Sequence, residues 1–157
     1  MNQPSALIPV TTGWLRVLRL GLLMSACGWG ISFMFTFSPW ERASYQLYVM
    51  GADRLTYDPL LDYWLKMASS VFGCIGIASA LACWKPHRFA SFIHLLAPFH
   101  FIIGAVLVCA AAGNHLNPKR QPTFIPDITF CFLTATLISL PLVFDWWKQC
   151  HRPRQRP

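Results

Sequence analysis

The clearest candidate for chemistry is His100, which lies near the middle of a long apolar run. Away from water, a buried imidazole without a hydrogen-bond partner costs about 1–3 kcal/mol, so we expect another side chain to bond to it. His94 lies ~9 Å away on the same expected helix, at the edge of the same face. Four polar side chains of other apolar runs are expected at about the depth of His100: Ser25, Cys74, Thr134 and Thr136.

Three interpretations of His100 and His94 are open. The first is haem ligation, in which two axial ligands approach from opposite faces of the ring. Two histidines on one helix do not meet that requirement, so a bis-histidine haem would need a second subunit. The second is a quinone or lipid site in which His100 donates a hydrogen bond. The third, which we favour, is a structural histidine that ties two helices together, and with it no cofactor is expected.

A second polar cluster is expected at the other end of the apolar runs. Asp62 and Lys66 are one helical turn apart and can form an ion pair. Asp127 begins another apolar run at a similar depth, and Arg54 and His115 lie in the flanking connections. These five residues suggest a ligand-binding vestibule for a polar headgroup or a small anion. The alternative is an ordinary ion pair at the membrane interface.

Four apolar runs must position these residues, and each is long enough to cross a bilayer. About 20 apolar residues in a helix cover the ~30 Å hydrocarbon layer. The runs occupy Leu15–Phe37, Tyr63–Trp84, Phe89–Ala112 and Asp127–Trp147. The chain has 157 residues, of which 55% are hydrophobic and 12% charged, a charged fraction about half that of a soluble domain. The sequence therefore predicts an all-α polytopic membrane protein, a four-transmembrane-helix bundle forming one domain over residues 1–157.

The connections carry local signals for where helices begin and turn. Asp58 followed by Pro59 is typical of a helix start, and Asp127 is expected to cap the fourth helix after the extended, proline-containing segment 113–126. The four residues 85–88 form a tight turn, which predicts that the second and third helices are antiparallel neighbours. The connection 38–62 mixes aromatic and charged residues, as expected of a segment at headgroup depth.

The net charge of +7 is distributed unevenly between the two ends of the expected bundle. Eight of the thirteen basic residues fall on one side, namely Arg16, Arg19, Lys85, Arg88, Lys148, Arg152, Arg154 and Arg156. The other side carries five basic residues and five of the six acidic ones. The positive-inside rule then predicts that both termini, including a basic tail at 148–157, are cytoplasmic. A membrane explains this basic excess, so nucleic-acid binding is not expected.

Small residues recur at helical spacing within the runs and are expected to mediate helix packing. In lipid, such stripes allow close approach of two backbones. The stripes comprise Gly21, Ser25, Gly28 and Ser32 in the first run, Ser69, Gly73, Gly76 and Ala80 in the second, and Gly104 in the third.

The sequence lacks the motifs of common enzyme and metal sites. None of its six cysteines forms a C-x-x-C pair, and four of them lie inside apolar runs, where cysteine behaves as a small hydrophobic residue. The patterns G-x-S-x-G and H-E-x-x-H and a glycine-rich phosphate loop do not occur. We expect no catalytic residue and no metal site.

Several of these features together resemble a family of membrane proteins. They are the chain length, the long first outer connection, the second-helix pattern Lys66-Met67-Ala68, Phe72-Gly73 and Gly76, and a fourth helix opened by Asp127. Over residues 14–147 the chain resembles the small bacterial four-span proteins of the DoxX-like kind. The resemblance implies a bacterial inner (plasma) membrane protein, and some members look like accessory subunits of membrane oxidoreductases. No catalytic residue is carried over from that family to this chain.

Two functional hypotheses follow. The first is a small non-enzymatic membrane protein that acts as an accessory or assembly subunit of a larger complex. The second is a quinone-, lipid- or haem-binding membrane component that uses His100. The expected partners are the lipid bilayer and either other membrane proteins or further copies of this chain.

Overall fold

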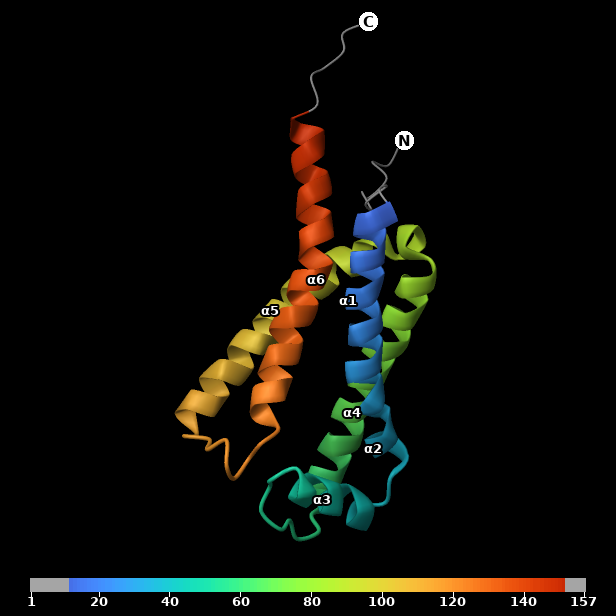
Figure 1. Ribbon diagram of the computed structural model, residues 1–157. Helices are drawn as coiled ribbons and strands as arrows, with labels where there is room; N and C mark the ends of the chain where they lie inside the picture. Colours follow the sequence, from blue (N-terminus) through green and yellow to red (C-terminus); the bar gives the residue numbers. More distant parts are fainter. Residues whose placement is uncertain (1–11, 152–157) are drawn as a thin grey trace, which may run out of the picture.

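The structure is a computed structural model that describes residues 12–151, in which every regular element is a helix (Figure 1). The elements are α1 (Thr12–Ile31), α2 (Phe33–Phe37), α3 (Trp40–Val49), α4 (Pro59–Trp84), the 3₁₀ helix η1 (Pro86–Phe89), α5 (Ala90–Gly113) and α6 (Phe124–Cys150). Four helical segments are long and apolar enough to cross a membrane: residues 12–37, 59–84, 86–113 and 124–148. The predicted all-α bundle of four membrane-spanning helices is confirmed.

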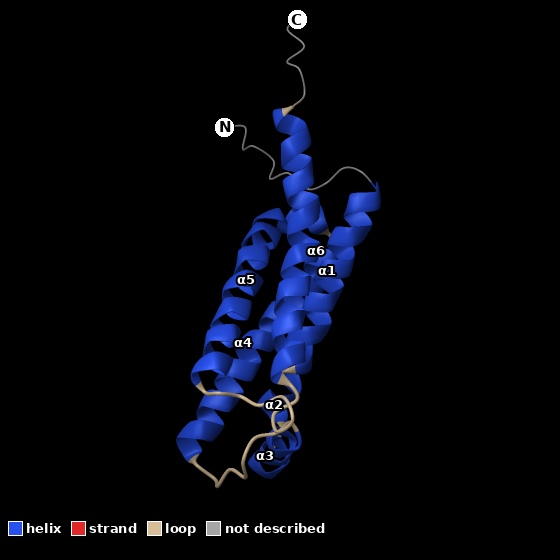
Figure 2. Cartoon of the chain, turned by 60° about the vertical axis from the view of Figure 1, so that its left-hand side comes forward, coloured by secondary structure: helices blue, strands red, loops and turns tan. Residues whose placement is uncertain are grey.

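The centre of the bundle is α1, which packs along α4 on one side and α6 on the other. The fourth partner, α5, packs mainly against α6 (Figures 1 and 2). Helices α4 and α5 are joined by η1 but diverge from it and make few contacts with each other. The prediction that their tight turn makes them packed neighbours is therefore wrong. A short turn fixes only the ends that it joins, whereas packing along a helix depends on the side chains that face each other.

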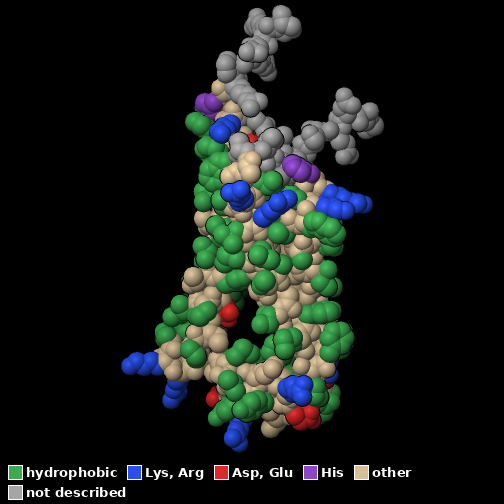
Figure 3. All heavy atoms as spheres, turned by 45° about the vertical axis from the view of Figure 1, so that its right-hand side comes forward, with side chains coloured by type: hydrophobic (Ala, Val, Ile, Leu, Met, Phe, Trp, Pro, Cys, Tyr) green, Lys and Arg blue, Asp and Glu red, His purple; other side chains and the backbone are tan. Residues whose placement is uncertain are grey.

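The two ends of the bundle differ in charge. The start of α1, the α4–α5 turn and the end of α6 lie together at what we call the basic end. Its described cationic residues are Arg16, Arg19, Lys85, Arg88 and Lys148. The opposite, aromatic end consists of α3 and the connections 50–58 and 114–123, and it carries both cationic and acidic side chains (Figure 3). Which end faces the cytoplasm stays a prediction.

The first predicted span is interrupted at Ser32, where α1 ends and α2 begins. The amide of Ser32 bonds to the carbonyl of Trp29 at 3.2 Å, a tighter turn than an α-helix makes. After this break α2 continues along α4, and the ring of Phe33 lies against Gly73. A side chain at position 73 would occupy the space that this ring fills.

The start of α4 agrees with the sequence, and the start of α6 does not. Asp58 Oδ1 accepts hydrogen bonds from the amides of Leu60 and Leu61 at 2.8 and 3.1 Å, with Pro59 in the first turn. Helix α6 begins at Phe124, so Asp127 lies within its first turn and does not cap it. Pro126 is tolerated there because first-turn amides have no intrahelical acceptor.

The small-residue stripes meet their partners at three interfaces. A Cβ atom at Gly76 of α4 would lie 2.5 Å from the backbone nitrogen of Gly30 in α1. At Gly21 of α1 it would lie 2.9 Å from Ile138 Cγ1 of α6, and at Gly104 of α5 it would lie 3.1 Å from the Phe132 ring of α6.

Other members of the predicted stripes differ in their surroundings. Gly28 lies against the ring of Phe130, whereas Ala80 is exposed on the outside of α4. Ser32 is half-buried at the break between α1 and α2. Residues 152–157 of the predicted basic tail lie outside the described residues.

Candidate functional site

Both ring nitrogens of His100 are already hydrogen-bonded inside the bundle. The side chain is 0% exposed, and its Nε2 lies 2.8 Å from the indole Nε1 of Trp29 on α1. Because an indole N–H can only donate, Nε2 must accept, and the ring proton is then on Nδ1. Nδ1 lies 2.8 Å from the carbonyl oxygen of Leu96 and donates to it. This neutral imidazole links α5 to α1 and has no nitrogen free for a ligand.

Aromatic rings surround this hydrogen bond on several sides. The imidazole of His100 lies edge-on to Trp29, Phe99 and Phe130, with centroid distances of 5.6, 6.0 and 6.0 Å. Phe72 of α4 packs against the Trp29 indole at 4.8 Å. The rings come from α1, α4, α5 and α6, so the Trp29–His100 bond lies where all four spans converge.

The partner of His100 is therefore Trp29 rather than any of the side chains expected from depth. Ser25 Oγ lies 3.0 Å from Ser79 Oγ of α4 instead. Cys74 is exposed, Thr136 donates to the carbonyl of Phe132 at 2.8 Å, and the buried Thr134 Oγ1 has no hydrogen-bond partner. The sequence did contain a signal for the Trp29–His100 pair. Trp29 lies one turn after Ser25, and a buried indole N–H usually has a hydrogen-bond acceptor.

The structure separates His94 from His100. His94 is exposed on α5, whereas His100 is buried. The expectation that the two share a face is wrong, since six residues correspond to about 1.7 turns of helix and place them on different sides. The proposed haem, quinone and lipid roles of these histidines stay predictions. Each role that uses His100 would first require one of its nitrogens to be released: Nε2 from Trp29 for a ligand to a haem, or the Nδ1 proton from the carbonyl of Leu96 for a donor to a quinone or lipid.

At the aromatic end, Lys66 and Asp62 form the predicted ion pair. Lys66 Nζ lies 2.6 Å from Asp62 Oδ2, with the side chains 40% and 17% exposed. Asp62 Oδ1 is buried and has no hydrogen-bond partner. A pair this exposed and one turn apart on a helix typically contributes less than about 1 kcal/mol.

The other three predicted vestibule residues make no hydrogen bond or ion pair with these two side chains within residues 12–151. The Arg54 guanidinium stacks over the Tyr48 ring at 5.5 Å, and His115, with φ of 51°, is exposed in the loop after α5. Asp127 is exposed in the first turn of α6. Within the described chain, only Lys66 and Asp62 of the five are joined by a hydrogen bond or an ion pair. Figure 3 shows a hollow between the helices above this end, with an acidic side chain at its edge.

Serine and threonine side chains join α4 to the first span at two further levels. Near the basic end, Ser79 donates to its own helix at Ile75 O and accepts from Ser25. Near the aromatic end, Thr36 Oγ1 lies 3.1 Å from Ser69 Oγ and 3.3 Å from Ser70 Oγ. The polar side chains of this interface thus bond to each other or to nearby carbonyls.

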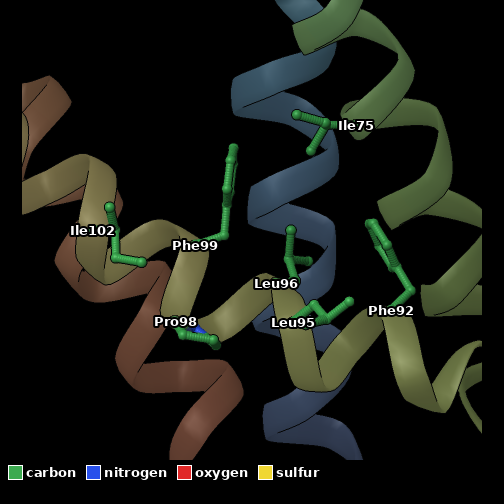
Figure 4. A pocket seen from close by; sticks show the side chains of 7 residues that line it. All are labelled: Ile75, Phe92, Leu95, Leu96, Pro98, Phe99 and Ile102. Atoms are coloured by element: carbon green, nitrogen blue, oxygen red, sulfur yellow. The ribbon is translucent and has the colours of Figure 1, made fainter.

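The gap between α4 and α5 contains a pocket of about 440 Å³ that opens to the outside of the bundle (Figure 4). Its lining is entirely apolar and consists of Ile75 from α4 and six residues from α5: Phe92, Leu95, Leu96, Pro98, Phe99 and Ile102. We call it the α4–α5 groove. A second apolar pocket, of about 400 Å³, lies between α3 and the first span.

The histidine, cysteine and acidic side chains of the described residues form neither a metal-binding group nor a disulfide. Residues 12–151 contain no group of three or more His, Cys, Asp or Glu arranged to hold a metal ion. Five described cysteines are free thiols, and of these only Cys131 is buried.

Comparisons with known proteins add no assignment: no family model, no curated protein and no solved structure matches this chain. The resemblance to DoxX-like proteins therefore stays a prediction.

Proposed function

We propose that this protein is a non-enzymatic accessory subunit of a membrane complex and that the aromatic end binds its partner. The observation that carries the proposal is a folded platform at that end, built from α3, two connections and the start of α4. Its exposed residues are Tyr45, Tyr48, Tyr57, Tyr63 and Trp64, which we call the aromatic platform.

Contacts between distant parts of the chain hold this platform in place. Trp40 and Ala43 anchor α3 by burial, and the Trp40 ring packs against Tyr57 at 5.8 Å. Thr123 Oγ1 donates to the carbonyl of Met50 at 3.3 Å. Next to it, Gly51 has a φ of 105°, and a Cβ atom there would lie 2.6 Å from the carbonyl oxygen of Arg120. The exposed tyrosines are thereby presented on a fixed surface rather than on a loose loop.

The chemistry of the platform suits a protein partner. Tyrosine, tryptophan and arginine are enriched at the energetic centres of protein interfaces. Arg54, stacked on Tyr48, adds a cation to the aromatic surface, and Tyr45, Tyr48 and Arg54 also line a shallow pocket of about 230 Å³. Tyrosine and tryptophan are also common at headgroup depth, so the platform is suited to a partner that is itself embedded in the membrane.

The interior of the bundle supports a non-catalytic role. The imidazole of His100 and the hydroxyls of Ser25 and Ser79 are engaged in hydrogen bonds between or within helices. A catalytic group must instead have an atom available to its substrate. The competing quinone or haem role has no such atom at His100, and the subunit role requires none.

The test is co-purification from native membranes in a mild detergent. We expect the wild-type protein to elute with a stoichiometric partner, and the double substitution Tyr45→Ala/Tyr48→Ala to lose it. Trp146→Ala is the matched control, because Trp146 is similarly exposed but lies near the basic end. A wild-type protein that elutes alone, or only as a homo-oligomer, would contradict the proposal.

A further inference from the structure

We propose that the α4–α5 groove binds an acyl chain of an anionic phospholipid from the leaflet at the basic end, with the lipid phosphate held by Arg88 and Lys85. The proposal concerns a different part of the molecule from the aromatic platform and does not depend on the accessory role.

The length and position of the groove match one leaflet. Along α5 it runs from Phe92, near the start of the helix, to Ile102. Ten residues of helix cover about 15 Å, which is half of the ~30 Å hydrocarbon layer. The groove therefore extends from the α4–α5 turn to about the middle of the membrane, as one lipid tail does. Figure 4 shows that its side chains come from α5 on one side and α4 on the other.

The lining favours an acyl chain over a partner helix. Close helix packing in lipid depends on small residues, and the seven lining residues include no Gly, Ala or Ser. A helix with side chains is also about 10 Å or more across. The groove volume of about 440 Å³ is roughly three times that of an engineered apolar cavity that binds benzene, which provides room for an extended alkyl chain.

The lining also disfavours a quinone. A quinone ring carries carbonyl oxygens that gain from a hydrogen-bond donor, and every lining side chain is a hydrocarbon. Phe99 lines the groove and is also in ring contact with both His100 and Trp29, with centroid distances of 6.0 Å. Both nitrogens of that imidazole are engaged, so no donor behind Phe99 is free for a ligand.

Two cationic residues lie in the α4–α5 turn, at the end of the groove where the headgroup of such a lipid is expected. Arg88 lies in the 3₁₀ helix η1, four residues before Phe92, in the turn at the basic end of the groove. Lys85 Nζ lies 5.0 Å from the ring centroid of Trp84, an exposed aromatic residue at the same turn. Neither cation forms an ion pair within residues 12–151. An arginine beside a lysine is well suited to phosphate, because the guanidinium donates two parallel hydrogen bonds.

The first experiment compares two lipids that differ only in headgroup. Delipidated protein in detergent is titrated with dioleoyl phosphatidylglycerol or dioleoyl phosphatidylcholine, and bound lipid is counted by native mass spectrometry. We expect one tightly retained phosphatidylglycerol and weaker binding of phosphatidylcholine. Raising the salt concentration should release the anionic lipid from the wild-type protein, because salt screens the headgroup contact.

Variants then separate the headgroup contact from the groove. Arg88→Gln and Lys85→Gln should each weaken phosphatidylglycerol binding about fivefold, and the double variant roughly 25-fold. Lys119→Gln/Arg120→Gln, at the aromatic end, is the control and should bind as the wild type does. Leu95→Trp places a ring over the mouth of the groove and should weaken both lipids, whereas Leu140→Trp on α6 should weaken neither.

Three results would overturn the proposal. They are equal affinity for the two lipids in the wild type, binding that is unaffected by both Leu95→Trp and the Arg88/Lys85 substitutions, and a photocrosslinker at Leu95 that captures a protein helix instead of lipid. The salt titration uses only the wild-type protein, so it tests the headgroup contact even where a variant fails to fold.

Discussion

The two long faces of α4 differ in chemistry, and the difference explains why the bundle is closed on one side and open on the other. Toward the first span, α4 presents small and polar residues: Ser69, Gly73, Gly76 and Ser79. Toward α5 it presents Ile75 to a groove otherwise lined by large apolar residues of α5. The first face is packed along its length, whereas the second is separated from its neighbour although a turn of only a few residues joins the two helices.

This comparison teaches that connection length does not determine packing in a membrane bundle. Lipid tails are as apolar as leucine, so large apolar side chains gain little by leaving lipid for another helix. Small residues stabilise a helix pair in lipid because they let the two backbones approach closely, and polar side chains stabilise it because they find hydrogen-bond partners there. Helix α5 accordingly packs through Gly104 against α6, and through His100 against Trp29 of α1.

The largest expected effect is at the closed face of α4. Gly76→Leu should lower the free energy of unfolding by about 3 kcal/mol, because even a Cβ atom would lie 2.5 Å from the backbone of Gly30, which cannot move aside as a side chain can. Ala80→Leu, on the same helix but exposed, is the control and should have little effect. Unfolding in mixed micelles titrated with sodium dodecyl sulfate, followed by circular dichroism, measures both. A Gly76→Leu protein as stable as the control would show that close approach is not what holds this face together.

The second effect concerns the hydrogen bond that crosses the bundle. Trp29→Phe should destabilise the protein by about 2 kcal/mol, because it shortens a buried side chain and leaves Nε2 of His100 without its donor. In a double-mutant cycle with His100→Phe, the two changes should show a coupling of about 1 kcal/mol. His94→Phe, at an exposed position, should be neutral. Independent effects of the two substitutions, or a haem Soret band that appears in the wild-type protein and vanishes with His100→Phe, would contradict the structural interpretation.

A smaller effect of opposite sign is expected at Thr134. Its Oγ1 is buried without a partner, so Thr134→Val keeps the shape of the side chain and removes an unsatisfied hydroxyl. We expect stability to rise by about 1 kcal/mol in the same titration. Thr136→Val, which removes a satisfied and exposed hydroxyl, should not stabilise. If Thr134→Val instead destabilises the protein, the buried hydroxyl of Thr134 stabilises the bundle even without a hydrogen-bond partner.

Most of the fold was predictable because it depends on patterns within single helices. The four spans follow from hydropathy, the start of α4 from Asp58 and Pro59, and the close contact at Gly76 from small residues at helical spacing. The break at Ser32 was not predicted, because hydropathy is unchanged across it. The divergence of α4 and α5 arises because α5 packs against α6 rather than against α4. A pattern within the sequence of one helix does not show which of two neighbours that helix packs against.

The candidate site was predictable only in part. The need of His100 for a partner follows from its position in an apolar run, and the Lys66–Asp62 pair follows from spacing. The choice of Trp29 depends on the rotation of α1 relative to α5, which is set by how each of these helices packs against α6. The α4–α5 groove likewise exists because α4 and α5 do not pack together. The sequence of neither helix alone predicts this.

The smallest effect is expected in the groove, and it completes the comparison. Leu95 is 70% exposed, so Leu95→Ala removes few contacts with protein and exchanges them mainly for lipid or detergent. We expect a loss below about 0.5 kcal/mol, against about 3 kcal/mol for Gly76→Leu on the closed face. Leu22→Ala is the matched control: it removes the same atoms from a fully buried position in α1 and should cost about 2 kcal/mol or more. A Leu95→Ala protein as unstable as Leu22→Ala would mean that α4 and α5 pack together in the membrane, and the groove would then not be available to a lipid chain.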